Sequence, residues 1–85
     1  MSYAIKLHPK VNRFLNKCDK SLSDRIKKRL RMLKENPFRY LEHYAGKGYY
    51  KLRVGDYRAL VDADTSRKIV FVRVLGHRKR IYKRV

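Results

Sequence analysis

Residues 49–61 read Tyr49-Tyr50-Lys51-Leu52-Arg53-Val54-Gly55-Asp56-Tyr57-Arg58-Ala59-Leu60-Val61, and this segment decides the fold. Polar and apolar side chains alternate on both sides of Gly55-Asp56, as is typical of β-strands. Gly55 tolerates a positive φ angle, so the Gly55-Asp56 dipeptide suits a tight two-residue turn. The segment therefore predicts a β-hairpin.

The two-residue turn also predicts the register of this hairpin. The expected pairs are Val54 with Tyr57, Arg53 with Arg58, and Lys51 with Leu60. Directly opposed residues share a face of the sheet, so one face is basic and carries Lys51, Arg53 and Arg58. The other face carries Tyr50, Leu52, Val54, Tyr57, Ala59 and Val61.

The basic face of the hairpin has two interpretations. Like charges directly opposite each other destabilise a sheet, which favours a missing anion. A phosphate would suit Arg53 and Arg58, because a guanidinium presents a planar fork of donors to its oxygens. The alternative is a solvated strand face in a chain rich in lysine and arginine.

The composition favours a polyanionic partner. The 85 residues, enough for one domain, include 24 Lys+Arg against 7 Asp+Glu, which gives a formal net charge of +17. Such a chain repels itself unless nucleic acid or an acidic protein is near. A membrane partner is not expected, because there is no long apolar run. Cys18 is the only cysteine and no signal peptide is evident, so we expect a reducing, cytoplasmic setting.

The first half of the chain predicts a strand and two helices. Residues 3–7 alternate weakly, as in a strand. Pro9 suits the first position of a helix that runs to Lys17. Ser21 and Asp24 resemble a capping box for a second helix that ends near Glu35. The apolar stripes of the two helices are Val11, Phe14 and Leu15, and Leu22, Ile26, Leu30 and Leu33.

The second half predicts a loop, the hairpin and a last strand. Residues 38–47 are expected to form a connecting loop, and residues 64–67 a turn. The last strand is expected over 68–75, with Val70, Val72 and Val74 on one face and Gly76 as its end. The tail, residues 77–85, could be a short helix or an extended strand.

This order of elements predicts an α+β fold with an antiparallel sheet. Both N-terminal helices pack on one face of that sheet. The opposite face has no helix to cover it, and the basic face of the hairpin points there.

Several kinds of site are not expected. The sequence contains no Ser-His-Asp arrangement and no glycine-rich phosphate loop. Asp62 and Asp64 are the only acidic residues close together, which argues against a metal site, and no cofactor is predicted. The histidines His8, His43 and His77 are scattered, and only His77, beside Arg78, is placed to contact a phosphate.

The chain resembles the RelE/ParE toxin superfamily over essentially its whole length. The resemblance rests on residues 52–58, on the acidic turn and valine-rich strand that follow, and on the ending Gly76-His77-Arg78-Lys79-Arg80-Ile81-Tyr82. That ending is similar to the RelE-type branch. The resemblance implies one RelE-like toxin domain over 1–85, with a sheet like that of microbial ribonucleases. It also implies cleavage of messenger RNA in the ribosomal A site and inhibition by a small antitoxin.

The resemblance also implies roles for individual residues. Arg58 and Arg78 would contact the scissile phosphate, and Lys51 matches a basic residue of the active strand. Tyr82 matches a tyrosine with base or stacking roles. Some members carry a second active-site lysine two residues before the position of Lys51, where this chain has Tyr49. Arg53 is expected to supply the positive charge of that missing lysine. The residues expected to bind RNA are Lys47, His77, Lys79, Arg80 and Lys83.

This chemistry needs neither metal nor cofactor. The 2′-OH of RNA attacks the adjacent phosphate and leaves a 2′,3′-cyclic phosphate and a 5′-OH end, while fixed cations stabilise the phosphorane. Lysine and tyrosine have ordinary pKa values of about 10.4 and about 10. Lys51 or Tyr82 could therefore act as the base only if neighbouring cations lower its pKa.

Two alternatives remain open. A ParE-like protein would inhibit DNA gyrase without hydrolysis. A plain RNA- or ribosome-binding protein would bind through charge and stacking tyrosines and form no product. The predicted protein partner is an acidic, RelB-like antitoxin.

Overall fold

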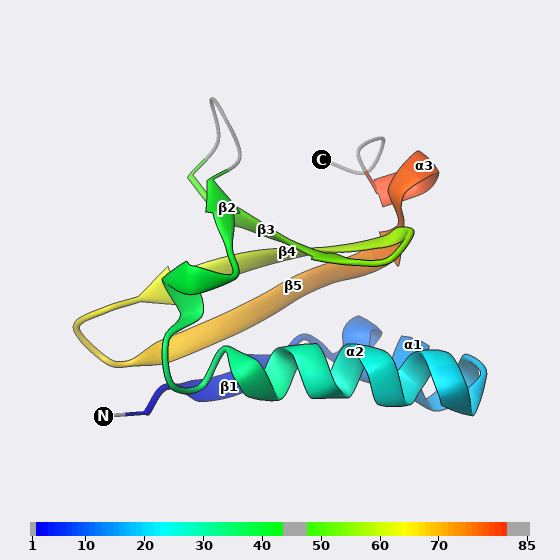
Figure 1. Cartoon of the computed structure of the whole chain (residues 1–85), viewed down its shortest axis with the longest axis horizontal. Helices are drawn as coiled ribbons and strands as arrows, with labels where there is room; N and C mark the ends of the chain where they lie inside the picture. Colours follow the sequence, from blue (N-terminus) through cyan, green and yellow to red (C-terminus); the bar gives the residue numbers. More distant parts are fainter. Residues whose placement is uncertain (1, 44–47, 82–85) are drawn as a thin grey trace.

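The computed structural model describes residues 2–43 and 48–81. In chain order the elements are β1 (Ala4–Leu7), α1 (Pro9–Lys17), α2 (Lys20–Met32), the 3-10 helix η1 (Pro37–Arg39), β2 (Glu42–His43), β3 (Tyr50–Val54), β4 (Tyr57–Asp64), β5 (Ile69–His77) and α3 (Arg78–Ile81). The strands form one mixed sheet in the order β1-β5-β4-β3-β2. Helices α1 and α2 cover one face of the sheet (Figure 1), which confirms the predicted α+β class.

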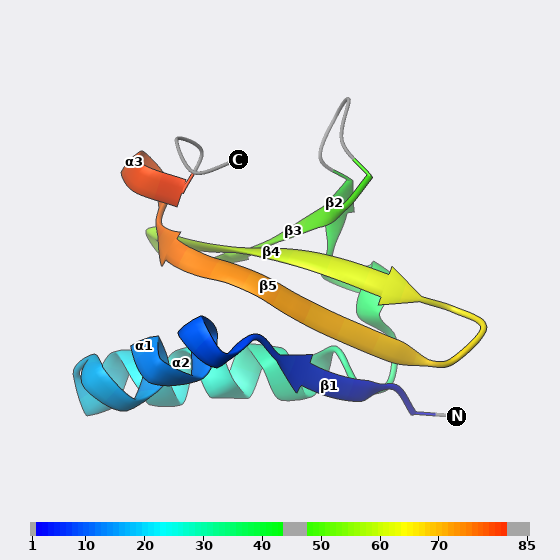
Figure 2. The same ribbon diagram turned by 180° about the vertical axis from the view of Figure 1, so that it is seen from behind.

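The sheet is antiparallel except at one edge. Ala4 pairs with Ile69 and Leu7 with Val72, so β1 runs parallel to β5. Figure 2 shows the two strands side by side and pointing the same way. A parallel pair needs a long connection, and here α1, α2 and the hairpin lie between the two strands in sequence. The first strand thus occurs as predicted, but it joins the sheet in the parallel sense.

The β3–β4 hairpin has the predicted register. Val54 pairs with Tyr57 and Arg53 with Arg58, and Gly55 has a φ of 59°. The residues of its apolar face that enter the core are Leu52, Val54, Ala59 and Val61.

The helices pack as predicted, but α2 begins and ends differently. Asp19, and not Ser21, is the N-cap: its carboxylate accepts a hydrogen bond from the Leu22 N–H at 3.2 Å. The expected capping box is therefore wrong, because Ser21 is already inside the helix. The helix ends at Met32, whereas the sequence predicted about Glu35.

The expected loop over 38–47 contains structure. It begins with η1, and Glu42 and His43 form β2, which pairs with β3. A two-residue strand offers no alternation that a sequence pattern could reveal. Residues 44–47 lie outside the described ranges.

Strand β5 differs from the prediction at both ends. Lys68 has a φ of 58°, so the strand starts at Ile69. Gly76 does not end the strand but pairs with Arg58 inside it. A bulge shifts the register between Leu60 and Val61, and beyond it Leu75, not Val74, is buried in the core.

The sequence predicted that no helix covers the second face of the sheet, and this prediction is wrong. Helix α3 lies on the side of the sheet away from α1 and α2 (Figure 1). Ile81 of α3 is only 1% exposed, and it packs over Gly76, where an added Cβ would lie 4.0 Å from the Ile81 Cβ. The tail therefore starts as a helix that is anchored on the sheet.

Replacing Gly55 with alanine should destabilise the hairpin. At Gly55 the positive φ disfavours any Cβ, and an added Cβ would lie 2.6 Å from the Arg25 Nη2. We expect Gly55→Ala to lower the free energy of unfolding by about 1–2 kcal/mol in urea titrations. Gly48→Ala is the control, because no atom lies within 4 Å of its added Cβ. Equal effects of the two substitutions would contradict the strained turn.

Replacing Asp19 with alanine tests the corrected start of α2. Loss of the N-cap should reduce the free energy of unfolding by about 1 kcal/mol. Ser21→Ala should have almost no effect, because Ser21 is exposed within the helix. If Ser21→Ala lowered the free energy of unfolding more than Asp19→Ala in the same titrations, the N-cap would be Ser21, as the capping box predicts.

Candidate functional site

Arg58 is held at the turn of the β3–β4 hairpin. Arg58 is buried, with only 7% of the residue exposed. Its Nη1 donates hydrogen bonds to the carbonyl oxygens of Gly55 at 2.7 Å and Tyr57 at 2.9 Å. A buried charge needs such partners. Both acceptors are neutral carbonyls, so they orient the guanidinium without cancelling its charge.

Arg78 reaches the same turn from α3. Its backbone N–H donates to the Asp56 carbonyl oxygen at 2.8 Å. Its side-chain Nε lies 3.9 Å from the Asp56 carboxylate, and the Arg78 side chain is 53% exposed. An exposed ion pair at this distance is weak. The turn Gly55-Asp56 thus brings Arg58 and Arg78, which are distant in sequence, to one place.

Arg53 and Lys51 lie on the same face of the hairpin as Arg58. Arg53 is directly opposite Arg58 and is exposed. Lys51 pairs across the sheet with Glu42, whose carboxylate lies 3.8 Å from its Nζ. Lys51 therefore has an acidic neighbour that sequence reasoning missed, because β2 was expected to be loop.

His77 is directed away from Arg58. Across the strands it pairs with Tyr57, and the two rings meet edge to face at 5.4 Å. The Nδ1 atom of His77 accepts a hydrogen bond from the Lys79 N–H at 3.2 Å, at the start of α3. Adjacent residues of a strand point to opposite faces, so His77 shares a face with Tyr57 and not with Arg58.

Two exposed basic residues line a pocket at the end of the sheet. Lys79 and Arg80 of α3 line a pocket of about 490 Å³ whose other walls are Phe14, Tyr57, Leu75, Gly76, His77 and Ile81. The remaining predicted site residues, Lys47, Tyr82 and Lys83, lie outside the described ranges.

Two features of the site had no signal in the residue types alone. The sequence predicts only a turn residue at Asp56, yet this residue contacts both the backbone and the side chain of Arg78. It predicts a strand end at Gly76, yet the missing side chain of Gly76 makes room for Ile81. The Gly76-His77-Arg78 motif was the available pointer to both.

Residues 2–43 and 48–81 contain no group of three or more His, Cys, Asp or Glu side chains placed to hold a metal ion. Within the same ranges, no helix has the length and apolar character needed to cross a bilayer. At the turn, the guanidinium groups of Arg58 and Arg78 can bind oxyanions and stabilise developing negative charge.

Comparison with known proteins places these features in a family. The family model described as "ParE toxin of type II toxin-antitoxin system, parDE" matches residues 5–82. No curated protein sequence matches the chain significantly.

Solved structures share the fold. A chain of the archaeal RelE-RelB complex from Pyrococcus horikoshii OT3 is 25% identical, with a TM-score of 0.81 over 94% of this chain and 99% of that one. The toxin–antitoxin complex RelBE2 from Mycobacterium tuberculosis contains a chain that is 20% identical, with a TM-score of 0.79 over 91% of this chain and 99% of its own. A mutant of E. coli toxin RelE in the free state is 21% identical, with a TM-score of 0.72 over 100% of this chain and 99% of that chain.

The family match confirms the resemblance read from the hairpin and the Gly76-His77-Arg78 ending. The chain belongs to the ParE toxin family of type II toxin–antitoxin systems, within the RelE/ParE superfamily.

Proposed function

We propose that this toxin is a metal-independent endoribonuclease that cleaves messenger RNA in the ribosomal A site and so inhibits translation. The observation that supports this most is the meeting of Arg58 and Arg78 at one turn, with Arg58 held by neutral carbonyls. A binding surface would not require a buried, oriented guanidinium. A reaction that builds charge on a phosphate would.

Arg58 and Arg78 would act together on the phosphate as its charge increases. The 2′-OH attacks the adjacent phosphorus, the bond to the 5′-oxygen of the next nucleotide breaks, and that oxygen takes up a proton. Arg58 and Arg78 would stabilise the phosphorane, which carries more charge than the starting diester. The exposed Arg78–Asp56 pair would open to admit the phosphate, at little cost because it is weak.

Lys51 and Tyr82 are the proposed partners for the proton of the 2′-OH. Lys51 lies on β3, two residues before Arg53 and on the same face of the hairpin. We assign Arg53 to the phosphate. We assign Lys47, His77, Lys79, Arg80 and Lys83 to RNA binding, the lysines and Arg80 by general attraction.

The proposed regulator is an acidic antitoxin. Similar solved structures are RelE-RelB complexes from Pyrococcus horikoshii and Methanococcus jannaschii. A net charge of +17 on this chain suits an acidic partner.

Inhibition of DNA gyrase is the second candidate function. It is favoured by the family model that matches, whose description names the ParE toxin. Inhibition of DNA supercoiling by the purified protein, with no cut in messenger RNA, would establish this function in place of the ribonuclease.

Replacing Arg78 with glutamine tests the ribonuclease function. In a reaction with translating ribosomes, Arg78→Gln should lower the rate of messenger RNA cleavage roughly a hundredfold, because one oxyanion donor is lost. Arg67→Gln is the matched control: Arg67 also forms an exposed pair, with Asp64 at 3.9 Å, but in the turn between β4 and β5. Arg78 is a cleaner choice than Arg58, because Arg58 also supports the turn.

The control and the variant must differ for the proposal to stand. Full activity of Arg67→Gln with loss in Arg78→Gln supports a phosphate site at the hairpin turn. Unchanged cleavage by Arg78→Gln would remove Arg78 from the chemistry. Absence of cleavage by the unmodified protein would remove the ribonuclease function itself.

Replacing Lys51 and Tyr82 together tests the general base. The double variant Lys51→Met/Tyr82→Phe should lower cleavage by roughly 10²–10⁴-fold, the contribution usual for a proton acceptor. Normal cleavage by this variant, in an assay where Arg58→Ala is inactive, would show that neither residue is the base.

A further inference from the structure

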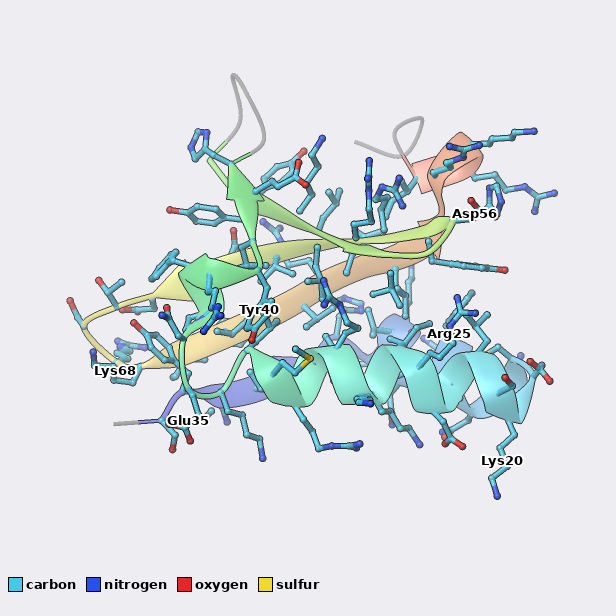
Figure 3. All side chains as sticks on the ribbon, viewed as in Figure 1. Lys20, Arg25, Glu35, Tyr40, Asp56 and Lys68 are labelled. Atoms are coloured by element: carbon cyan, nitrogen blue, oxygen red, sulfur yellow. The ribbon has the colours of Figure 1, made fainter. Side chains whose placement is uncertain are left out.

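A second cluster of cations lies on the other side of the hairpin turn, between α2 and β3. There a cleft of about 750 Å³ is lined by Arg25, Lys28, Arg29, Met32, Arg53, Val54 and Gly55. Figure 3 shows Arg25 on α2 close below the turn that carries Asp56. The cleft therefore combines basic residues with the apolar side chains of Met32 and Val54.

No carboxylate of the described residues neutralises this cleft. The ion pairs between residues of ranges 2–43 and 48–81 join Lys51 to Glu42, Arg67 to Asp64, Arg73 to Asp62 and Arg78 to Asp56. Arg25, Lys28 and Arg53 are exposed. Arg29 donates to the Arg53 carbonyl oxygen at 3.4 Å and lies over the Tyr40 ring. Within residues 2–43 and 48–81, no ion pair joins these cations to a carboxylate, and like charges this close repel one another.

Protection of a strand edge is the simplest alternative role for these cations. Strand β2 pairs with β3 only as far as Lys51, so the outer edge of β3 is open beyond that residue, and natural proteins often cover such edges with basic residues. One residue, Arg29, already covers the Arg53 carbonyl. Protection of the strand edge does not explain why Arg25 and Lys28 are there. The bonded carbonyl also makes the edge unsuitable for an added strand from a protein partner.

We propose that the cleft binds the phosphate backbone of the RNA on which the toxin acts. Lys28 and Arg29 each lie about one helical turn after Arg25, on the side of α2 that lines the cleft, so the three cations form one group beside which a phosphate backbone can pass. Gly55 joins the two sites, because it lines the cleft and its carbonyl accepts from Arg58. RNA held at Arg58 and Arg78 therefore continues past the turn and along α2. The inference relies on the proposed function only for the identity of the nucleic acid as RNA.

The double variant Arg25→Gln/Lys28→Gln tests the cleft against a matched control. The control, Arg13→Gln/Lys17→Gln, removes the same charge from exposed positions of α1. The probe is a single-stranded oligoribonucleotide with 2′-O-methyl riboses, which cannot be cut through a 2′-OH. Binding is measured by fluorescence anisotropy over a range of salt concentrations.

Loss of two phosphate contacts should lower the slope of log K against log salt by about 1.4, since each contact on a single strand contributes about 0.7. The control should change the slope by less than half of that. Both variants should unfold at the temperature of the unmodified protein or above it, because they reduce repulsion.

Two results would overturn the cleft proposal. One is an equal loss of slope in both variants, which would mean that only net charge matters. The other is a cleft variant that loses affinity for poly-glutamate but not for the oligonucleotide, which would assign the cleft to an acidic protein. The binding test does not depend on catalysis. If the protein does not cut messenger RNA but shows the slope difference, the ribonuclease proposal is rejected and the cleft proposal stands.

Discussion

The hydrogen bonds from Arg58 to two carbonyl oxygens of the β3–β4 turn are the contact on which the site depends. Bonds from a charged donor contribute about 1.5–3 kcal/mol each when buried, and those to Gly55 and Tyr57 measure 2.7 and 2.9 Å. These bonds fix the turn, and the turn then positions the residues that pack against it on both sides. The Asp56 carbonyl receives the Arg78 N–H and so places the start of α3. On the opposite side, Gly55 leaves space for Arg25.

The nature of the acceptors explains why this arrangement suits an anion. A carboxylate beside Arg58 would satisfy its donors and cancel its charge as well. Carbonyl oxygens satisfy the donors of Nη1 only, so the guanidinium stays charged and is oriented before any ligand arrives. Preorganised charge of this kind acts on a transition state without reorganisation. Arg73, by contrast, donates to the Asp62 carboxylate at 3.1 Å.

The sheet divides stability and charge between its two faces. The face under α1 and α2 is an ordinary apolar core. The face under α3 carries Arg53 and Arg58 directly opposite each other, an arrangement that costs stability in isolation. Because an anion that binds only the folded chain stabilises it by mass action, a partner that covers these cations should also strengthen the fold.

The two N-terminal helices and the hairpin register could be predicted from the sequence, because both follow from short-range periodicity. A period of two allows only one register once Gly55 sets the turn, so the placement of Arg53 opposite Arg58 was predictable. The family resemblance added Arg78, which no spacing rule connects to Arg58. Tertiary structure alone decided the parallel pairing of β1, the bulge in β5, the two-residue β2 that places Glu42 beside Lys51, and the cleft at Arg25. These features depend on contacts between segments far apart in the chain, and such contacts leave no periodic trace in any one segment.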